Sequence, residues 1–332
     1  MSVGIKDVAR VANVSTATVS RVLAGRAVDP AMQERVQDAV RATGYRPNLA
    51  ARRLRSRHTN TIGLIVADLR NPFFTAVSRM VEDIAYERGM RVILCNTDED
   101  PAKEAMYLQL MQEERVAGVI LAPTRKGLDH AARSRPDFPM VLIDRTAPGM
   151  AHDSVVLDNE AMAALLVEHL HRQGLTQIAG LFGADSATGA QRRAGFEQAA
   201  RRLGLEARTL SIPHGAGQTA QSVADLLEGP QRPQALVVSN GVMLMAVLRA
   251  VYALGLSVPG DIVLAGFDRE DWMDLVAGGL AIIEQPVEDI GRMAMTMLLD
   301  RLDHPDIPAR KVVLNGVLRA ASTPAPPSEP AP

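Results

Sequence analysis

The sequence has few of the residues that build disulfide scaffolds, aromatic stacks or membrane spans. Its 332 residues include one cysteine, Cys95, which cannot form an internal disulfide, and only 3% are aromatic. No run approaches the roughly 18 consecutive apolar residues of a membrane helix, and the first residues lack the basic and apolar segments of a signal peptide. With 47% hydrophobic and 22% charged residues, the composition is that of a globular protein. We therefore expect a cytoplasmic chain of two or three domains, at roughly 100–200 residues per domain.

Signatures of catalysis and of metal binding are also missing. Neither a G-x-S-x-G nucleophile elbow nor a P-loop occurs in the chain. His169 and His171 fall on different faces of a predicted helix and lack a matching set of metal ligands. His152, Asp153 and Ser154 are adjacent in sequence, a spacing that disfavours triad geometry. We therefore expect no enzyme, no cofactor and no metal.

The formal net charge of −2 conceals an uneven distribution of charge along the chain. Residues 1–60 contain 11 Lys and Arg residues against four Asp and Glu residues, so this segment carries +7 and the rest carries −9. A basic module joined to an acidic body is typical of a nucleic-acid reader with a separate second function. A basic segment can also be no more than a solvated face, so its motifs have to decide between the two.

The basic segment has the pattern of a helix-turn-helix. Apolar residues recur at helical spacing from Ile5 to Ala12, and Asn13 to Ser15 mark a stop followed by a new N-cap. A second short helix is predicted over 16–23 and a third over 30–43. The apolar stripe expected on the third helix consists of Met32, Val36, Ala39 and Val40.

The second helix is predicted to enter the major groove of DNA. Thr16, Ala17 and Arg21 are expected to be exposed on it, while Val19 and Val22 face inward. Arg21 can donate a bidentate pair of hydrogen bonds to a guanine. Thr16 can bond a base or a phosphate, and Ala17 can touch a thymine methyl group.

Residues beyond the third helix complete a family pattern. The head contains Ile5-Lys-Asp-Val-Ala, Val14-Ser and Thr18-Val-Ser-Arg-Val-Leu, and it is followed by Gly44-Tyr-Arg-Pro-Asn, Ala51 and Leu54. Together they resemble the DNA-binding head and hinge of the lactose-repressor (LacI/GalR) family. The resemblance implies that Thr18 contacts DNA together with Thr16, Ala17 and Arg21.

The hinge is predicted as a short helix over 49–54, capped by Asn48 and too short to persist alone. The resemblance implies that it orders only on operator DNA, in a dimer. Leu54 would then wedge a base step in the minor groove with Ala51 packed beside it, and Arg52 would reach a phosphate.

From Thr61 onward, apolar strands alternate with amphipathic helices. Strands are predicted at 62–67, 91–95, 116–122, 140–143, 178–182, 235–239 and 262–267. Helices are predicted near 74–88, 101–114, 159–173, 189–203, 218–228, 241–254 and 287–303. This alternation indicates α/β architecture with two doubly wound parallel sheets, and it matches the two-lobed, periplasmic-binding-protein-like core of the same family.

The expected domain organisation follows from these elements. The predicted parts are an all-α head at 1–47, a hinge helix and linker at 48–60, and an effector-binding and dimerisation core at 61–321. Within the core, the N-lobe is expected at about 61–158 and 288–316 and the C-lobe at about 159–287 and 317–321. Residues 322–332 contain five prolines and are expected to form a disordered tail.

Polar residues that follow strands are the candidates for ligand binding, because open α/β sheets bind ligands beyond the carboxyl ends of their strands. Together with what the family resemblance implies, they give Phe73, Arg145, Thr188, Arg192, Asn240, Asp268, Trp272 and Gln285 as the expected effector site. Phe73 and Trp272 could instead be core residues, and the polar members could be helix caps or solvated side chains. Hydroxyl-reading groups beside arginines favour a polyhydroxylated, anionic ligand.

The segment from Asp268 to Pro286 resembles the branch of the family that regulates sugar-acid use, including 2-ketogluconate and keto-deoxygluconate repressors. We therefore predict a homodimeric repressor that binds a pseudo-palindromic operator on double-stranded DNA and responds to a small sugar acid such as 2-ketogluconate. A neutral sugar or a purine is the alternative effector. A cytoplasmic sugar-binding protein without regulatory output is the alternative class.

Overall fold

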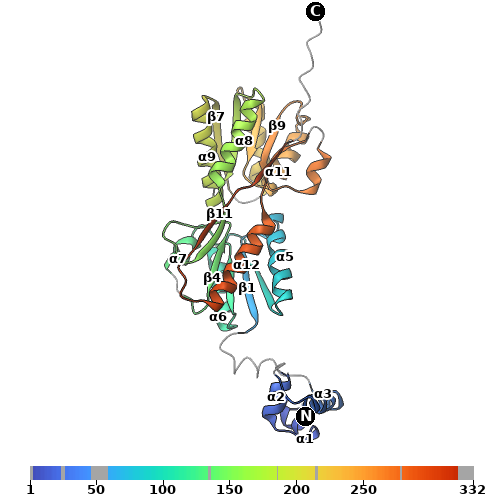
Figure 1. Ribbon diagram of the computed structural model, residues 1–332. Coiled ribbons are helices and arrows are strands. Elements are labelled where there is room, and N and C mark those ends of the chain that lie inside the picture. The colour runs from blue at the N-terminus through green and yellow to red at the C-terminus, as the bar shows by residue number, and fades with distance from the viewer. Residues whose placement is uncertain are drawn as a thin grey trace, which may run out of the picture. The chain divides into compact units, whose positions relative to one another are not determined.

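The computed structural model describes residues 3–23, 27–45, 59–133, 136–184, 186–213, 216–276 and 279–320. The chain forms two compact units, Met1–Thr59 and Asn60–Pro332, and each is described by itself (Figure 1). Within the described ranges, no helix combines the length and the apolarity that a membrane crossing requires.

The first unit contains three helices, α1 (Ile5–Val11), α2 (Thr16–Leu23) and α3 (Pro30–Thr43). Asn13 turns the chain between the first two with a left-handed φ of 51°, and the Ser15 hydroxyl accepts the Thr18 N–H at the start of α2. Asp29 caps α3, and Gly44 ends it in the left-handed conformation. The core of this unit consists of Val8, Ala9, Ala12, Val19, Val36 and Ala39.

The predicted apolar stripe of α3 is wrong at one position. Met32 is 38% exposed, whereas Val36 and Ala39 are buried and Val40 packs against the core. Met32 lies in the first turn of α3, beside the Asp29 cap.

The second unit has two lobes, each built on a six-stranded sheet. Sheet 1 has the strand order β11-β5-β4-β3-β1-β2, and its paired strands are all parallel. Its strands are β1 (Thr61–Val66), β2 (Arg91–Asn96), β3 (Gly118–Leu121), β4 (Met140–Ile143), β5 (Asp153–Leu157) and β11 (Lys311–Leu314). The central strands β1, β3, β4 and β5 are buried throughout, as expected for a parallel sheet covered on both faces.

Sheet 2 repeats this order as β12-β10-β9-β8-β6-β7. Its strands are β6 (Gln177–Gly183), β7 (Glu206–Ile212), β8 (Ala235–Val238), β9 (Val263–Phe267), β10 (Ala281–Glu284) and β12 (Val317–Ala320). The expectation of a parallel sheet needs one correction here, because β12 runs antiparallel to β10. The chain enters β12 only two residues after it leaves β11 of sheet 1, so the direction of β12 is set by this return from lobe 1 and not by a crossover within sheet 2.

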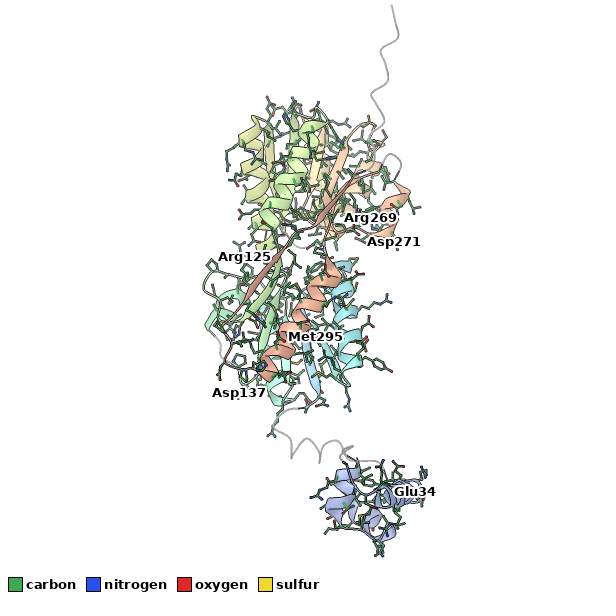
Figure 2. All side chains as sticks on the ribbon, viewed as in Figure 1. Glu34, Arg125, Asp137, Arg269, Asp271 and Met295 are labelled. Atoms are coloured by element: carbon green, nitrogen blue, oxygen red, sulfur yellow. The ribbon has the colours of Figure 1, made fainter. Side chains whose placement is uncertain are left out.

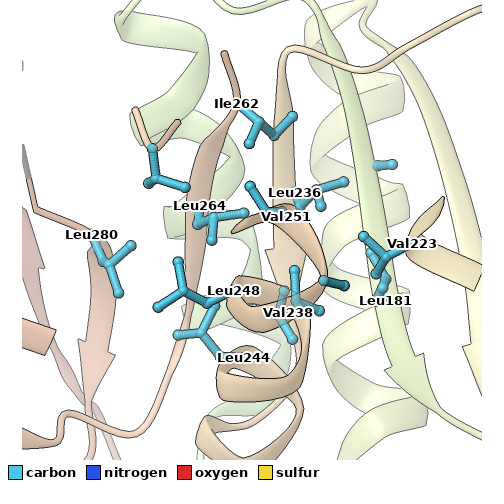
Figure 3. Close-up of a cluster of buried hydrophobic side chains, with 14 of the residues drawn as sticks. Leu181, Val223, Leu236, Val238, Leu244, Leu248, Val251, Ile262, Leu264 and Leu280 are labelled. Atoms are coloured by element: carbon cyan, nitrogen blue, oxygen red, sulfur yellow. The ribbon is translucent and has the colours of Figure 1, made fainter. Parts of the chain in front are cut away.

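Helices cover both faces of each sheet (Figure 1). In lobe 1 they are α5 (Pro72–Glu87), α6 (Pro101–Glu113), α7 (Gly127–Arg133) and α12 (Val287–Asp303). In lobe 2 they are α8 (Asn159–Arg172), α9 (Ala187–Leu203), α10 (Ala216–Glu228) and α11 (Gly241–Ala253), with a short 3-10 helix η1 (Asp271–Leu275). Figure 3 shows one of the lobe 2 clusters, in which Leu244, Leu248 and Val251 of α11 pack on strand side chains such as Leu236 and Leu264.

The chain passes between the two lobes three times. It crosses from β5 to α8, from β10 to α12, and from β11 to β12. β4 and β9 are each the third strand in the order of their sheet. Their carboxyl ends lead into Asp144 and Asp268. These strand ends position the candidate ligand site.

Candidate DNA-binding surface and ligand site

The exposed face of α2 carries three of the predicted DNA-reading residues. Thr16, Ala17 and Arg21 are exposed, and Val19 is completely buried in the core beneath them. Nothing among the described residues forms an ion pair with Arg21, so its guanidinium is available to an external acceptor. Thr18 differs from the other three because it is half-buried and its hydroxyl lies 2.9 Å from the Ser15 hydroxyl.

The hinge predictions cannot be placed in the same way. They lie outside the described residues and comprise Asn48, Ala51, Arg52 and Leu54.

In the second unit, Asp144 and Asp268 occupy matching places in the two sheets. Asp144 follows β4 with φ of 66°, and Asp268 follows β9 with φ of 70°. The left-handed region costs a residue other than glycine of the order of 1 kcal/mol, and such strain concentrates at functional sites. Both side chains are buried, with 9% and 5% of their surface exposed.

The lobe 1 side of the site is organised around Arg145. Its Nε donates to Asp144 over 2.9 Å, its Nη1 and Nη2 donate to both oxygens of Glu99 over 2.7 and 2.5 Å, and Nη1 also reaches the Pro123 carbonyl. Four of its five N–H groups are therefore used within the lobe. Burial alone would lower the pKa of Arg145, but Asp144 and Glu99 raise it above its ordinary value.

Asp144 shows the reverse balance. Burial raises the pKa of the Asp144 carboxyl, and this effect outweighs the stabilisation of the carboxylate by Arg145 and Arg192. Arg192 belongs to lobe 2, so Asp144 interacts electrostatically with an arginine on each side of the lobe junction.

The lobe 2 side is organised around Arg192, which is 3% exposed. Its Nε donates to Asn159 Oδ1 over 2.7 Å, its Nη1 donates to the Ser239 carbonyl, and its guanidinium lies 3.9 Å from the ring centre of Phe267. Burial lowers the pKa of Arg192, although Asp268 and Asp144 oppose that shift. The Nη2 group forms no hydrogen bond with any described residue, so it remains a donor for a ligand.

The packing of α8 against α9 sets the position of Arg192. A Cβ added at Gly195, one turn after Arg192, would lie 2.2 Å from the Glu160 carbonyl oxygen. Only glycine permits this approach, which brings Arg192 of α9 to Asn159, the first residue of α8. Asn159 is itself held by hydrogen bonds from its Nδ2 to the Leu157 carbonyl and to Gln191.

The side chain of Asp268, which follows β9, contacts the first residue of α11. Its Oδ2 accepts the Gly241 N–H over 3.0 Å, and its Oδ1 accepts from Gln285 Nε2 over 2.5 Å. Asn240 is the N-cap of α11, since its Oδ1 accepts the Met243 N–H over 2.8 Å. The structure thus brings together Arg192, Asp268 and Gln285, whereas the side-chain oxygen of Asn240, Oδ1, is used as a helix cap.

Three other predicted ligand residues have structural partners. Phe73 is 4% exposed and packs edge to face on Phe74 in the lobe 1 core, and its role as a ligand contact stays a prediction. Thr188 is buried, and its hydroxyl lies 2.8 Å from the Ser186 hydroxyl that caps α9. Trp272 is half-buried against the lobe 2 core.

Two residues of the site were missed by sequence reasoning. Glu99 follows β2, and both it and Asp98 have left-handed φ values, which turns its carboxylate toward Arg145. Glu270 follows Asp268 by two residues, and Trp272 and Asp268 both influence the pKa of its carboxyl. The acidic run at 98–100 was the one available signal for Glu99.

The two lobes also make a direct hydrogen bond. Arg125 Nη1, from the loop after β3, donates to the Ala184 carbonyl after β6 over 2.8 Å. Figure 2 places Arg125 on one side of the lobe junction and Arg269 and Asp271 on the other. In the part of the chain that the structure describes, no group of three metal-binding side chains occurs.

Two domain families match the chain. Residues 4–48 match the model for bacterial regulatory proteins of the lacI family, and residues 167–323 match a periplasmic binding protein-like domain. A helix-turn-helix head joined to a two-lobed ligand-binding core defines a ligand-responsive regulator of transcription.

Similar proteins cover almost the whole chain. The HTH-type transcriptional regulator PtxS of Pseudomonas plecoglossicida is 35% identical over 95% of this chain and 94% of its own length. The ribose operon repressor of Escherichia coli (strain K12) is 32% identical over 95% and 97%. The chain belongs to the LacI family and is a DNA-binding transcriptional repressor of that family, and its relatives are regulators rather than enzymes.

The fold is also that of a solved repressor. A crystal structure of the lac repressor dimer bound to operator and the anti-inducer ONPF superimposes with a TM-score of 0.86, over 97% of this chain and 99% of that one. Its sequence identity is 24%, so this likeness concerns the fold alone.

Proposed function

We propose that this repressor binds a pseudo-palindromic operator as a homodimer and controls an operon for sugar-acid use, with a sugar acid such as 2-ketogluconate as its effector. A dimer is needed because one short recognition helix reads few base pairs, and two-fold symmetry doubles the site. The proposed effector follows from the resemblance of residues 268–286 to sugar-acid repressors.

The observation that carries the ligand proposal is the state of Arg192. It is a buried guanidinium with a free Nη2 group, and it lies between carboxylates of both lobes. A ligand carboxylate bound to Nη2 forms a charge-assisted hydrogen bond in a dry environment. Asp268 and Gln285 beside it provide acceptors and donors for ligand hydroxyl groups.

The change in operator affinity on effector binding would follow from contacts that differ between two arrangements of the lobes. The Arg125 to Ala184 hydrogen bond and the attraction between Asp144 and Arg192 both cross the junction. A ligand that binds one arrangement more tightly shifts the population toward it. The proposed hinge helices at 49–54 would convert that shift into a change in operator affinity.

A neutral sugar is the second candidate, and the charge balance of the site favours it. Arg145 is already occupied by Asp144 and Glu99, and carboxylates outnumber arginines around the junction. The ribose operon repressor among the relatives fits this alternative.

Calorimetry with 2-ketogluconate, gluconate and ribose separates the two candidates. Binding of 2-ketogluconate with at least tenfold preference over ribose supports the sugar-acid effector, whereas the opposite preference overturns it. The operator part is tested by a gel-shift titration with salt, in which log affinity falls with a slope of about −0.9 per neutralised phosphate. A flat response to salt would contradict DNA binding through the basic head.

A further inference from the structure

Glu270 lies directly over the first residue of α11, at a position that only glycine leaves open. A Cβ added at Gly241 would be 2.5 Å from Glu270 Oε1 and 3.2 Å from Asp268 Cβ. Carbon atoms do not approach a carboxylate oxygen that closely, so any side chain at 241 would displace the Glu270 carboxylate. The absence of a side chain at 241 therefore makes room for this acid at the carboxyl end of sheet 2.

The Trp272 indole is a neighbour of the Glu270 carboxylate. It favours the charged form of that carboxylate, and it packs against the lobe 2 core. Burial raises the pKa of the Glu270 carboxyl, and the nearby Asp268 carboxylate raises it further, against the effect of Trp272.

No cation among the described residues neutralises Glu270. The adjacent Arg269 does not pair with the Glu270 carboxylate, since its Nη1 donates to the Glu270 main-chain carbonyl over 2.5 Å and its Nη2 donates to both oxygens of Asp274 over 2.7 Å. The N-terminus of α11 does not need Glu270 either, because Asn240 caps the helix and Asp268 accepts the Gly241 N–H. A half-buried carboxylate beside a second buried carboxylate has no structural task here, and such groups are typical of functional sites.

The place of Glu270 in the fold is that of a ligand-facing group. It follows β9, and its sequence neighbours Arg269 and Asp271 lie at the junction of the two lobes (Figure 2). Open α/β sheets bind ligands beyond such strand ends.

We propose that Glu270 is a specificity-determining residue of the effector site, where its carboxylate and that of Asp268 together accept hydrogen bonds from neighbouring hydroxyl groups of a polyhydroxylated ligand. This inference rests on the proposed effector site at the lobe junction. It adds to Asp268 a second carboxylate that binds ligand hydroxyl groups. Gly241 leaves the space for this carboxylate, and Trp272 lies beside it.

A measurement without ligand tests the position of the Glu270 carboxylate beside Trp272 separately from effector binding. Trp272 is the only tryptophan, so its fluorescence reports on the charge of the neighbouring Glu270 carboxylate. A pH titration should shift the emission of the wild-type protein and of an Asp271→Asn control as Glu270 titrates, at a pH above the ordinary glutamate value of about 4.3. Glu270→Gln should remove that transition. A transition that survives in Glu270→Gln, or none in the wild type, overturns the proposed pairing.

Calorimetry with 2-ketogluconate and ribose then tests the role of the pair. For whichever sugar the wild type binds, Glu270→Gln and Gly241→Ala should each weaken affinity by about tenfold or more, the usual loss for a hydrogen bond to a charged group. Asp271→Asn should stay within about twofold of the wild type.

Affinity of Glu270→Gln within about twofold of the wild type would overturn the inference. If the wild type binds neither sugar, the proposed effector class is contradicted instead. The fluorescence titration still decides whether the Glu270 carboxylate lies beside Trp272. Operator binding without sugar, measured in parallel, confirms that each variant is folded.

Discussion

Arg192→Met is expected to abolish the effector response and to lower the free energy of unfolding of the core by about 2–4 kcal/mol. Methionine keeps an unbranched side chain that replaces the apolar stem of arginine, while it removes the guanidinium, its charge and every N–H donor. The substitution therefore removes the electrostatic role of Arg192 and keeps the packing of its apolar stem.

The magnitude follows from the contacts of the guanidinium. Hydrogen bonds from a charged group contribute about 1.5–3 kcal/mol each, and a desolvated cation over an aromatic ring contributes about 2 kcal/mol. Arg192 makes two such hydrogen bonds, to Asn159 and Ser239, and lies over Phe267. Relief from burying a charge offsets part of this loss, which leaves the net value of about 2–4 kcal/mol.

Urea unfolding followed by Trp272 fluorescence measures the stability, and calorimetry with 2-ketogluconate measures the ligand response. Arg193→Met is the matched control, because the Arg193 side chain is 43% exposed and pairs with Glu197 on the same helix. Exposed pairs of this kind contribute about 0.2–1 kcal/mol. An unchanged ligand titration in Arg192→Met would remove Arg192 from the site, and a stability loss no greater than that of Arg193→Met would refute the energetic reasoning.

Three further predictions concern DNA binding and the stability of lobe 1. Arg21→Ala should lower discrimination between operator and random DNA by about 1–3 kcal/mol in competition gel shifts; an equal loss on every sequence would indicate a phosphate contact instead. Leu54→Ala should weaken operator binding while leaving non-specific binding nearly intact, and normal operator affinity would exclude the wedge. Asp153→Asn should cost about 3–5 kcal/mol in urea unfolding at neutral pH, because Asp153 is fully buried and accepts hydrogen bonds from Arg301 and Arg310. Although burial acts in the opposite direction, these arginines hold the pKa of Asp153 below its ordinary value of 3.8, so its contribution is complete above that pH and is lost as the pH falls through the folded value. Wild-type stability that falls no more steeply with acid than that of Asp153→Asn would contradict this assignment.

Local signals explain why so much of the fold was predictable from the sequence. The Ser15 and Asp29 caps and the left-handed Asn13 and Gly44 are encoded within a few residues, so the three head helices begin and end where predicted. The buried strands β1, β3, β4 and β8 are short apolar runs between turn residues, which is a strong signal for parallel sheets.

Edge strands carried a weaker signal. β7 is Glu206–Ile212, an outer strand whose first three residues are exposed, so it lacks an apolar run. β12 pairs antiparallel with β10, although the two are far apart in sequence order. Neither its partner nor its direction is encoded locally, because both depend on how the chain returns between the lobes.

The sequence predicted where the residues of the candidate site lie in the fold, but not which residues they pair with. Arg145, Arg192 and Asp268 follow or face strand ends, which the sequence pattern locates. The partner of Arg145, however, is Glu99, which lies 46 residues earlier. Phe73 could not be assigned to core or ligand from the sequence because a helix start beyond a strand end serves both, and the structure adds its packing against Phe74.

The repeated position of Asp144 and Asp268 would make the proposed site sensitive to the arrangement of the lobes. The Asp144 N–H donates to the Val155 carbonyl over 3.2 Å, and the Asp268 N–H donates to the Ile283 carbonyl over 3.1 Å, so each aspartate is bound in the same way to the neighbouring strand of its own sheet. Arg192 interacts electrostatically with both, yet it shares a lobe only with Asp268. Movement of the lobes would change the Asp144 interaction and leave the Asp268 interaction intact. A ligand that engages Arg192 would therefore alter an attraction that depends on lobe position, which is the differential contact that an allosteric response requires.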